Sequence, residues 1–452
     1  MLKLFSSRRL AQPLLFRSVL RCIAVLVVLG ISCGSSHAYS VLTHEEIIDL
    51  LWNDHLRPMI QARYPGLTED QIREAHAYAY GGAVIQDMGY YPFGNKEFSD
   101  LVHYVRSGDF VLELIKESQT ADEYAFALGA LSHYAADVTG HPAVNQAVAI
   151  AYPKLRAKFG SIVLYAQDKT AHIRTEFGFD MAQVAKERYA PQQYHDFIGF
   201  QVSKELLERV FPVVYGMQLK DVVPHEDLAI GSFRYSVSSL IPHMTQVALK
   251  THKKEIMREV PNFQKQKFLY RLSRADYEKS WGNNYQRAGF GVRLLAVLLK
   301  IIPKVGPLKA LDFKVPTPRT ESMYFTSINQ TVDQYGALLG TVQKKSSLKL
   351  PDDDLDTGKP TAAGEYTLAD DTYEKMLSQL ADKKFDATTA ALQKNILGFY
   401  SDSAAPIKAK KDPGKWQKVQ ANLDALKTLA PGPAQPVAPN AQPAAAAPSG
   451  GR

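Results

Sequence analysis

Two pairs of residues in the first half of the chain, each a histidine and a carboxylate, have the spacing of metal ligands. His133 and Asp137 are four residues apart, and so are His172 and Glu176. On a helix, side chains four residues apart lie on one face, about one turn from each other. An imidazole and a carboxylate so placed can bind Zn2+ at ~2.0 to 2.2 Å. His141 follows Asp137 by four more residues, and we predict a metal site here.

Three further residues stand in contexts typical of metal ligands. Asp87 and His103 flank a short aromatic loop, and His44 lies close to the start of the globular part. A single histidine and carboxylate pair on a helix is usually an ordinary surface or core pair. Two such pairs with His141 in one helical region favour metal binding instead. After residue 39 the other histidines lack this context, and we interpret them as structural: His55, His76, His195, His225, His243 and His252.

The cysteine content limits the kind of metal site. The chain has only Cys22 and Cys33, so a disulfide framework and a four-cysteine metal site are both excluded. Any metal must therefore be bound by histidines and carboxylates.

Helices must position these ligands. From Ser40 to about Pro242 apolar residues recur at three- and four-residue spacing without sustained alternation, which predicts an all-α domain. Thr68 with Gln71 and Thr120 with Glu123 match capping boxes, and they predict helices near 69–81 and 121–139. Gly140 and Pro142 indicate the end of the second helix, which would place His141 at or just past it.

The composition changes along the chain and indicates its organisation. We expect a signal peptide at 1–38, the all-α catalytic domain at 39–242 and a helical extension of unknown role at 243–350. The acidic run at 352–356 predicts a solvated linker at 351–372, because its spacing does not suit a calcium loop. Terminal helices at 373–429 and a disordered tail rich in Pro and Ala at 430–452 complete the chain.

The N-terminal segment has the pattern of an export signal. Residues 1–38 carry five basic side chains, no acidic one and an apolar run from Ile23 to Ile31 that is too short to span a bilayer. Cleavage after Ala38 would make Tyr39 the first residue of a secreted or periplasmic protein. Export by the twin-arginine route and lipid anchoring through Cys33 are alternatives.

The net charge of +7 depends largely on that segment. Without its five cations, 48 basic residues face 46 acidic ones, and the mature charge falls to +2. The charge therefore gives little support to a polyanion-binding function.

Four segments, in this order, resemble the zinc-dependent phospholipase C family over roughly residues 39–240: Thr43–Ile47, Asp87–Pro92, Ser132–Pro142 and Ala171–Gly178. The spacing His133-x3-Asp137-x3-His141 is similar to the branch that includes glycosylphosphatidylinositol-cleaving phospholipase D. Secreted bacterial phospholipases C and fungal single-strand nucleases of this fold carry two more residues before the second histidine.

The resemblance implies an all-α domain with three zinc ions. One zinc would be bound by Asp87, His103, His133 and Asp137, and a second by His141, His172 and Glu176. The third would take His44, a shared Asp137, and the free amino group and carbonyl of Tyr39. Mature members of the family often begin with Trp rather than Tyr. The difference does not affect the implied zinc ligand, because the backbone of the first residue binds the metal and its ring only packs.

The implied activity is phosphodiester hydrolysis through zinc-bound hydroxide. Asp87 and Asp137 are the candidate catalytic residues, with Asp87 assisting deprotonation of the nucleophile. A phospholipase C acting on phospholipids is our first interpretation. The alternatives are a phospholipase D-like enzyme, a single-strand nuclease, which alone would imply a nucleic-acid partner, and a non-enzymatic zinc-binding surface protein.

Two apolar features are compatible with peripheral membrane contact. The loop at 89–98 brings Tyr90, Tyr91, Phe93 and Phe98 near the expected cleft, although these rings could equally pack the loop. Residues 289–305 are apolar with interleaved cations, which suits a membrane interface or a buried helix. Met88 stands where choline-preferring members carry an aromatic residue, so the sequence does not predict which lipid headgroup is preferred.

Overall fold

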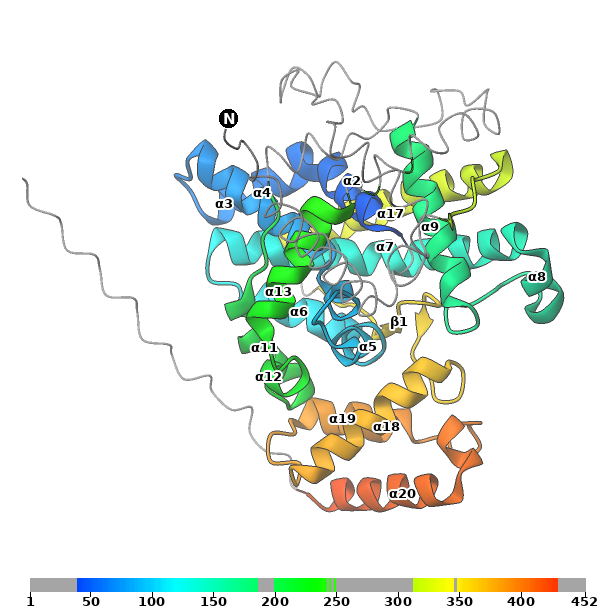
Figure 1. The fold of residues 1–452 in the computed structure, drawn as a ribbon. Helices are drawn as coiled ribbons and strands as arrows, with labels where there is room; N and C mark the ends of the chain where they lie inside the picture. The colour runs from blue at the N-terminus through cyan, green and yellow to red at the C-terminus, as the bar shows by residue number, and fades with distance from the viewer. Residues whose placement is uncertain are drawn as a thin grey trace, which may run out of the picture.

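A computed structural model describes residues 39–185, 199–241, 244, 248, 312–344 and 348–429, and these are almost entirely helical (Figure 1). Within these ranges the strands are β1 (Asp353–Asp354) and β2 (Lys359–Pro360), an antiparallel pair in which Asp353 lies opposite Pro360. The prediction of an all-α fold is therefore confirmed. The predicted signal peptide, the apolar stretch at 289–305, the Pro/Ala tail, and His195, His243 and His252 lie outside the described residues.

The helix α7 (Ala121–Ala151) is the element around which the others are arranged. It begins at Thr120, whose side-chain oxygen accepts a hydrogen bond of 3.1 Å from the N–H of Glu123. Helices from both halves of the chain pack against it, among them α2 (Val41–Leu51), α4 (Glu69–Ala83), α6 (Ser107–Glu117), α9 (Lys169–Ala185) and α17 (Pro318–Gln343). Side chains far apart in the sequence therefore meet on this helix.

The predicted end of α7 near residue 139 is wrong, because the helix continues to Ala151 with Pro142 inside it. Gly140 does not end the helix. A Cβ there would lie 2.6 Å from the ring of Tyr39, so the position must be small to let Tyr39 pack. Gly and Pro inside a helix cost about 1 and 3 kcal/mol relative to Ala. Tertiary contacts on this stretch offset that cost, because the Tyr39 ring packs on Gly140 and Thr331 of α17 hydrogen-bonds to Thr139. They keep His141 in the helix.

The predicted capping box at Thr68 and Gln71 is confirmed, because each side chain accepts a hydrogen bond from the other residue's backbone N–H. The rest of the N-terminal half consists of short elements: η1 (Trp52–Leu56), α3 (Arg57–Arg63), η2 (Ile85–Tyr90), α5 (Lys96–Tyr104), α8 (Pro153–Phe159), α11 (Lys204–Tyr215), α12 (Leu219–Val222), α13 (Glu226–Tyr235) and η3 (Ser236–Leu240).

The C-terminal half packs on the N-terminal half rather than apart from it. Its later elements are α18 (Thr367–Asp382), α19 (Ala390–Phe399), η6 (Lys408–Lys411) and α20 (Pro413–Thr428). One hydrophobic core runs from Tyr39 to Leu426. On α17, the hydroxyl of Tyr335 donates to the carbonyl of Leu128 on α7 at 2.8 Å. In the described part of the chain, no helix has the length and apolarity to cross a bilayer.

Candidate metal centre

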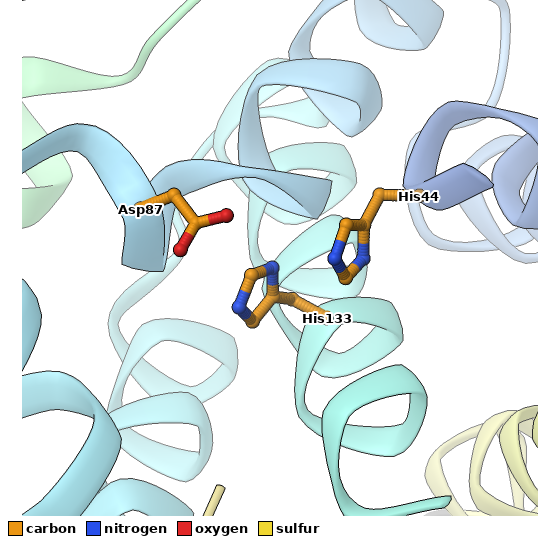
Figure 2. Close-up of side chains that lie close together, drawn as sticks. All are labelled: His44, Asp87 and His133. Carbon is orange, nitrogen blue, oxygen red and sulfur yellow. The ribbon is translucent and has the colours of Figure 1, made fainter. Parts of the chain in front are cut away.

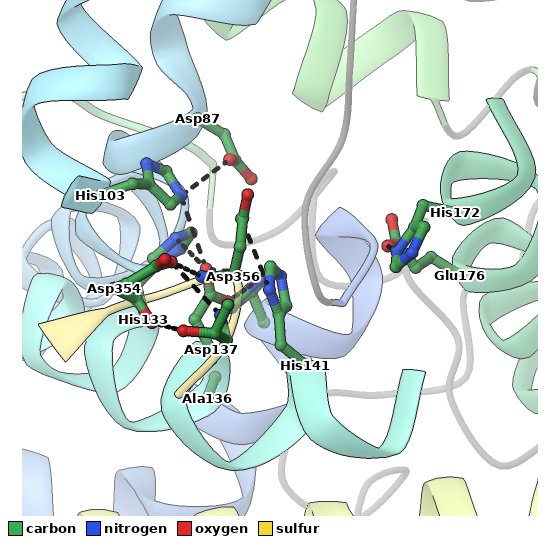
Figure 3. A network of polar contacts seen from close by, with 12 residues as sticks. Asp87, His103, His133, Ala136, Asp137, His141, His172, Glu176, Asp354 and Asp356 are labelled. Atoms are coloured by element: carbon green, nitrogen blue, oxygen red, sulfur yellow. Dashed lines mark hydrogen bonds and ion pairs between the residues drawn. The ribbon is translucent and has the colours of Figure 1, made fainter. Parts of the chain in front are cut away.

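Three of the predicted ligands lie on one face of α7. His133, Asp137 and His141 follow at four-residue spacing, and all three are buried. The Oδ2 atom of Asp137 lies 3.2 Å from Nε2 of His133 and 4.0 Å from Nε2 of His141. Continuation of the helix through Pro142 therefore gives Asp137 a histidine one turn away on each side (Figure 3).

Three neighbouring elements bring further ligands to the same place. His44 from α2 lies 3.6 Å from Asp137, and its ring stacks on that of His133 at 4.4 Å between centroids (Figure 2). His103 from α5 lies 3.5 Å from Asp137 and 3.7 Å from Asp87 of η2. Two sets have ligand atoms within 4.8 Å of one another: His44 with Asp87 and His133, and His103 with His133 and Asp137. The structure thus gathers His44, Asp87, His103, His133, Asp137 and His141, which we call the metal centre.

Backbone carbonyls fix the orientation of its histidines. Nδ1 of His133 lies 2.9 Å from the carbonyl oxygen of Ala83, and Nδ1 of His103 lies 2.7 Å from that of Ser99. Donation of Nδ1–H to a carbonyl leaves Nε2 as the nitrogen with a free lone pair, which is the usual arrangement of a metal-binding histidine. In both rings this Nε2 atom faces the carboxylates of the centre.

The second predicted pair lies on α9. Nδ1 of His172 is 3.5 Å from Glu176, and Nε2 lies 2.7 Å from the carbonyl oxygen of Val163. Both side chains are buried and face each other, apart from the cluster on α7 (Figure 3). Neither belongs to the two sets of close ligand atoms. Their sharing of one zinc with His141 stays a prediction.

Tyr39 lies next to the centre through its position just before α2. Its hydroxyl donates to Oγ of Ser327 at 2.7 Å, and its ring lies 6.0 Å edge-on from that of His44. The ring is fully buried and serves packing. The predicted ligands are instead the backbone amino group and carbonyl of Tyr39, and a free amino group there would require cleavage after Ala38.

The buried charges of the centre act on one another. Burial raises the pKa of Asp137, but His133 and His103 outweigh this effect and hold it well below its usual value. Burial favours the neutral form of His133, yet Asp137 raises the pKa of that ring to about 9. Burial raises the pKa of Asp87 to about 6 and lowers that of His141 to about 3. His141 is therefore neutral at pH 7, as metal binding requires.

Several buried atoms of the site have no hydrogen-bond partner among the described residues. They are both ring nitrogens of His44, Nε2 of His133, both oxygens of Asp137, Nδ1 of His172 and both oxygens of Glu176. Such atoms are rare in folded proteins because their desolvation is uncompensated. All are nitrogen or oxygen donors of the type that Zn2+ binds. The residues present therefore fit zinc.

One buried acidic residue at this centre was not predicted from the sequence. Asp356, in the turn between β1 and β2, is fully buried, and its Oδ1 lies 3.5 Å from Nδ1 of His141 (Figure 3). Asp353 and Asp354 are buried as well, so the prediction that this segment is solvated is wrong. An acidic run is normally exposed, but here Tyr104, Tyr134 and Tyr366 donate hydrogen bonds to it. No local sequence pattern indicates these distant hydrogen-bond partners.

Most aromatic side chains of the loop at 89–98 pack against other parts of the protein and do not line the rim of the expected cleft. Tyr90 and Phe98 are buried, and Phe98 stacks on Phe211 at 5.8 Å between centroids. Tyr91 packs edge-on against Phe233 of α13 at 4.9 Å. Phe93 differs, because 47% of it is exposed and its φ is +63°. Phe93 is thus the ring of this loop that remains available to a partner.

Comparison with known families identifies this part of the chain. Residues 43–222 match the family model described as zinc dependent phospholipase C, and the match spans every predicted ligand except Tyr39. Searches among curated proteins and among solved structures found no match. The matched segment, the all-α fold and the metal centre agree with one another. Residues 43–222 belong to the zinc-dependent phospholipase C family.

Proposed function

We propose that this protein is an exported phospholipase C that hydrolyses the phosphodiester bond of phospholipids with the help of zinc. The observation that carries the proposal is the buried set of His and Asp donors on α7 and its neighbours, inside the segment that matches the family. Such a site, formed by histidine nitrogens and carboxylate oxygens, suits a dication and, with it, an anionic phosphate.

The ligands of the proposed site have separate roles. His44, Asp87, His103, His133, Asp137 and His141 would hold metal on α7 and its neighbours, and His172 with Glu176 would hold it from α9. When bound, zinc neutralises phosphate charge and makes a water molecule acidic enough to attack near neutral pH. Asp87, with a pKa of about 6, is mainly ionised at pH 7 and would accept the proton of that water.

The proposed export step would complete the set of ligands. Cleavage after Ala38 would free the amino group of Tyr39, five residues before His44. The packing of the Tyr39 ring against His44 and Gly140 supports this, because it holds the start of α2 beside the centre. Peripheral contact with a membrane is part of the proposal, with exposed Phe93 as the contact residue.

The test combines metal analysis with a substrate panel. The mature protein is assayed for bound zinc and for hydrolysis of phospholipids, as vesicles and as soluble short-chain lipids, and of single-stranded DNA and RNA. We expect up to three zinc ions per chain, release of diacylglycerol, and faster hydrolysis of vesicles. Phosphatidic acid as the product would indicate D-type cleavage, and degraded nucleic acid a nuclease. Zinc binding without turnover of any phosphodiester would refute an enzymatic function.

A further inference from the structure

Three histidines of the site share a kind of outer hydrogen-bond partner, a backbone carbonyl, that Nδ1 of His141 lacks among the described residues. His103, His133 and His172 each direct one ring nitrogen to a backbone carbonyl oxygen at 2.7 to 2.9 Å, which leaves the other nitrogen to face the buried carboxylates. Such an outer partner fixes the tautomer and the plane of a metal-binding ring. For His141 the residue that faces its Nδ1 is the carboxylate of Asp356, at 3.5 Å.

The orientation of His141 agrees with that of the other rings. While Nδ1 faces Asp356, Nε2 lies on the side of Asp137, at 4.0 Å. At 3.5 Å the contact between Nδ1 and Oδ1 is one of charge rather than a hydrogen bond. A carboxylate facing Nδ1 makes Nε2 a stronger ligand than a carbonyl does, because its negative charge stabilises positive charge on the ring.

Asp356 is itself held in place from several sides. Its Oδ2 accepts hydrogen bonds from the hydroxyls of Tyr104, at 2.7 Å, and Tyr366. Its carbonyl oxygen accepts from Nδ2 of Asn145 on α7 at 3.1 Å, and its N–H donates to Asp354 at 2.9 Å. With both the backbone and one carboxylate oxygen fixed, the position of Oδ1 toward His141 is determined.

The turn that carries Asp356 also fits one particular place on α7. Gly358 has a φ of +66°, and a Cβ there would lie 2.4 Å from the carbonyl oxygen of Val138. That carbonyl lacks its helical partner, because Pro142 has no N–H to donate to it. The proline inside α7 and the glycine of the turn therefore let the β1–β2 segment approach one turn from His141.

We propose that Asp356 is a positioning residue for His141, and that the C-terminal part of the chain thereby completes the metal centre. Asp356 lies outside the segment that matches the family model, residues 43–222. The inference rests on the proposed zinc chemistry, since it takes His141 as a ligand. It assigns the β1–β2 segment a role in metal affinity that the family match does not include.

The test compares zinc affinity in three full-length variants, by competition with a chelating dye, together with zinc content per chain. Asp356→Ala removes the carboxylate that faces His141. Asp356→Asn keeps an oxygen of similar geometry without the charge. Asp353→Asn is the matched control, because Asp353 lies in the same buried segment but contacts Tyr134 rather than a ligand. Circular dichroism and apo-protein melting check the fold of each variant.

We expect Asp356→Ala to weaken one zinc ion by about 10- to 100-fold, Asp356→Asn to weaken it less, and Asp353→Asn to bind as the wild type does. Unchanged zinc affinity in Asp356→Ala would overturn the proposal, and so would an equal loss in Asp353→Asn. If Asp356→Ala does not fold, Asp356→Asn is the deciding variant. Zinc affinity equal to that of the wild type in Asp356→Asn would then contradict the proposal. Because this assay uses no substrate, failure of the phospholipase proposal would show separately, as bound zinc without hydrolysis.

Discussion

The molecule contains two buried clusters of histidine and aspartate that look alike in sequence but differ in their contacts. The first is the metal centre on α7. The second, which we call the α2–α4 cluster, consists of Asp49, Trp52, His76 and Tyr80. In both clusters the histidine is 1% exposed or less. In both, two polar side chains stand four residues apart on one helix, His133 with Asp137 and His76 with Tyr80.

The contacts of the α2–α4 cluster are those of a structural core. Oδ1 of Asp49 lies 3.0 Å from Nε2 of His76 and also accepts a hydrogen bond from the hydroxyl of Tyr80. The ring of His76 stacks on Trp52 at 3.7 Å between centroids. In the metal centre, by contrast, the closest approach of His133 to Asp137 is 3.2 Å, and neither oxygen of Asp137 has a hydrogen-bond partner among the described residues. Burial and spacing are therefore common to both clusters. The carboxylate distinguishes them, because Oδ1 of Asp49 has two polar partners whereas both oxygens of Asp137 lack a hydrogen bond within the described part of the chain.

Removal of zinc should separate the two clusters most clearly. If zinc binds the folded chain alone, a free concentration 1,000-fold above the dissociation constant stabilises it by about 4 kcal/mol. A chelator should therefore lower the free energy of unfolding by about that amount, measured by urea denaturation. The variant Asp137→Ala is the control and should respond less to the chelator than the wild type, because of the predicted ions only the one at His141, His172 and Glu176 does not use that carboxylate. If the chelator does not change the urea midpoint of the wild type, the assignment of the centre as a zinc site is contradicted.

The same substitution tests catalysis. Asp137→Ala removes the carboxylate that three elements share, so hydrolysis should fall by more than about 100-fold, the upper range for loss of an outer partner. Zinc content should fall with it, and both are measured on the purified variant. Asp49→Ala serves as the matched control and should keep zinc and activity. Full activity of Asp137→Ala at reduced zinc content would exclude the proposed role.

Local sequence signals predicted the elements that carry most of the centre. The spacing of His133 and Asp137, and the caps at Thr68 and Thr120, are properties of single helices, and each appears in the structure. The end of α7 was misplaced, because Gly140 and Pro142 are helix terminators only where no packing offsets their cost. Here Gly140 makes room for Tyr39, a contact across 101 positions that no window of sequence contains.

At the site, Asp356 likewise could not be predicted from local sequence. Its acidic neighbours indicate a solvated segment, because charge runs usually stay in water. Burial becomes possible only through hydroxyls from α5 and from Tyr366 and through the approach of Gly358 to α7. Residues that join a site from a distant turn need a three-dimensional contact to be recognised, whereas His172 and Glu176 could be predicted from spacing alone.

Removing the shared acceptor of the α2–α4 cluster should affect stability and leave the metal untouched. Asp49→Ala would leave the His76 ring and the Tyr80 hydroxyl without that acceptor in the core, at a cost of about 2 to 3 kcal/mol. The measurement is the free energy of unfolding in urea at saturating zinc. Asp54→Ala, an exposed neighbour on η1, is the control and should change stability by less than about 0.5 kcal/mol. Loss of zinc from Asp49→Ala would show that the clusters are coupled.

The pH dependence of stability should reveal the α2–α4 cluster with the smallest effect. Burial lowers the pKa of His76, although Asp49 partly opposes it. The unfolded chain therefore binds a proton at this ring near pH 6.5 that the folded chain does not yet bind. Stability from His76 is present above pH 6.5 and declines as pH falls toward its folded pKa, by at most about 1.4 kcal/mol per pH unit. His76→Gln removes this titration but not the protonation of the metal ligands, which the two proteins share. The measurement is the unfolding free energy of both proteins at saturating zinc. From pH 7 to pH 5 the wild type should lose more stability than the variant. An equal loss in both would mean that His76 takes up its proton equally in the folded and unfolded states.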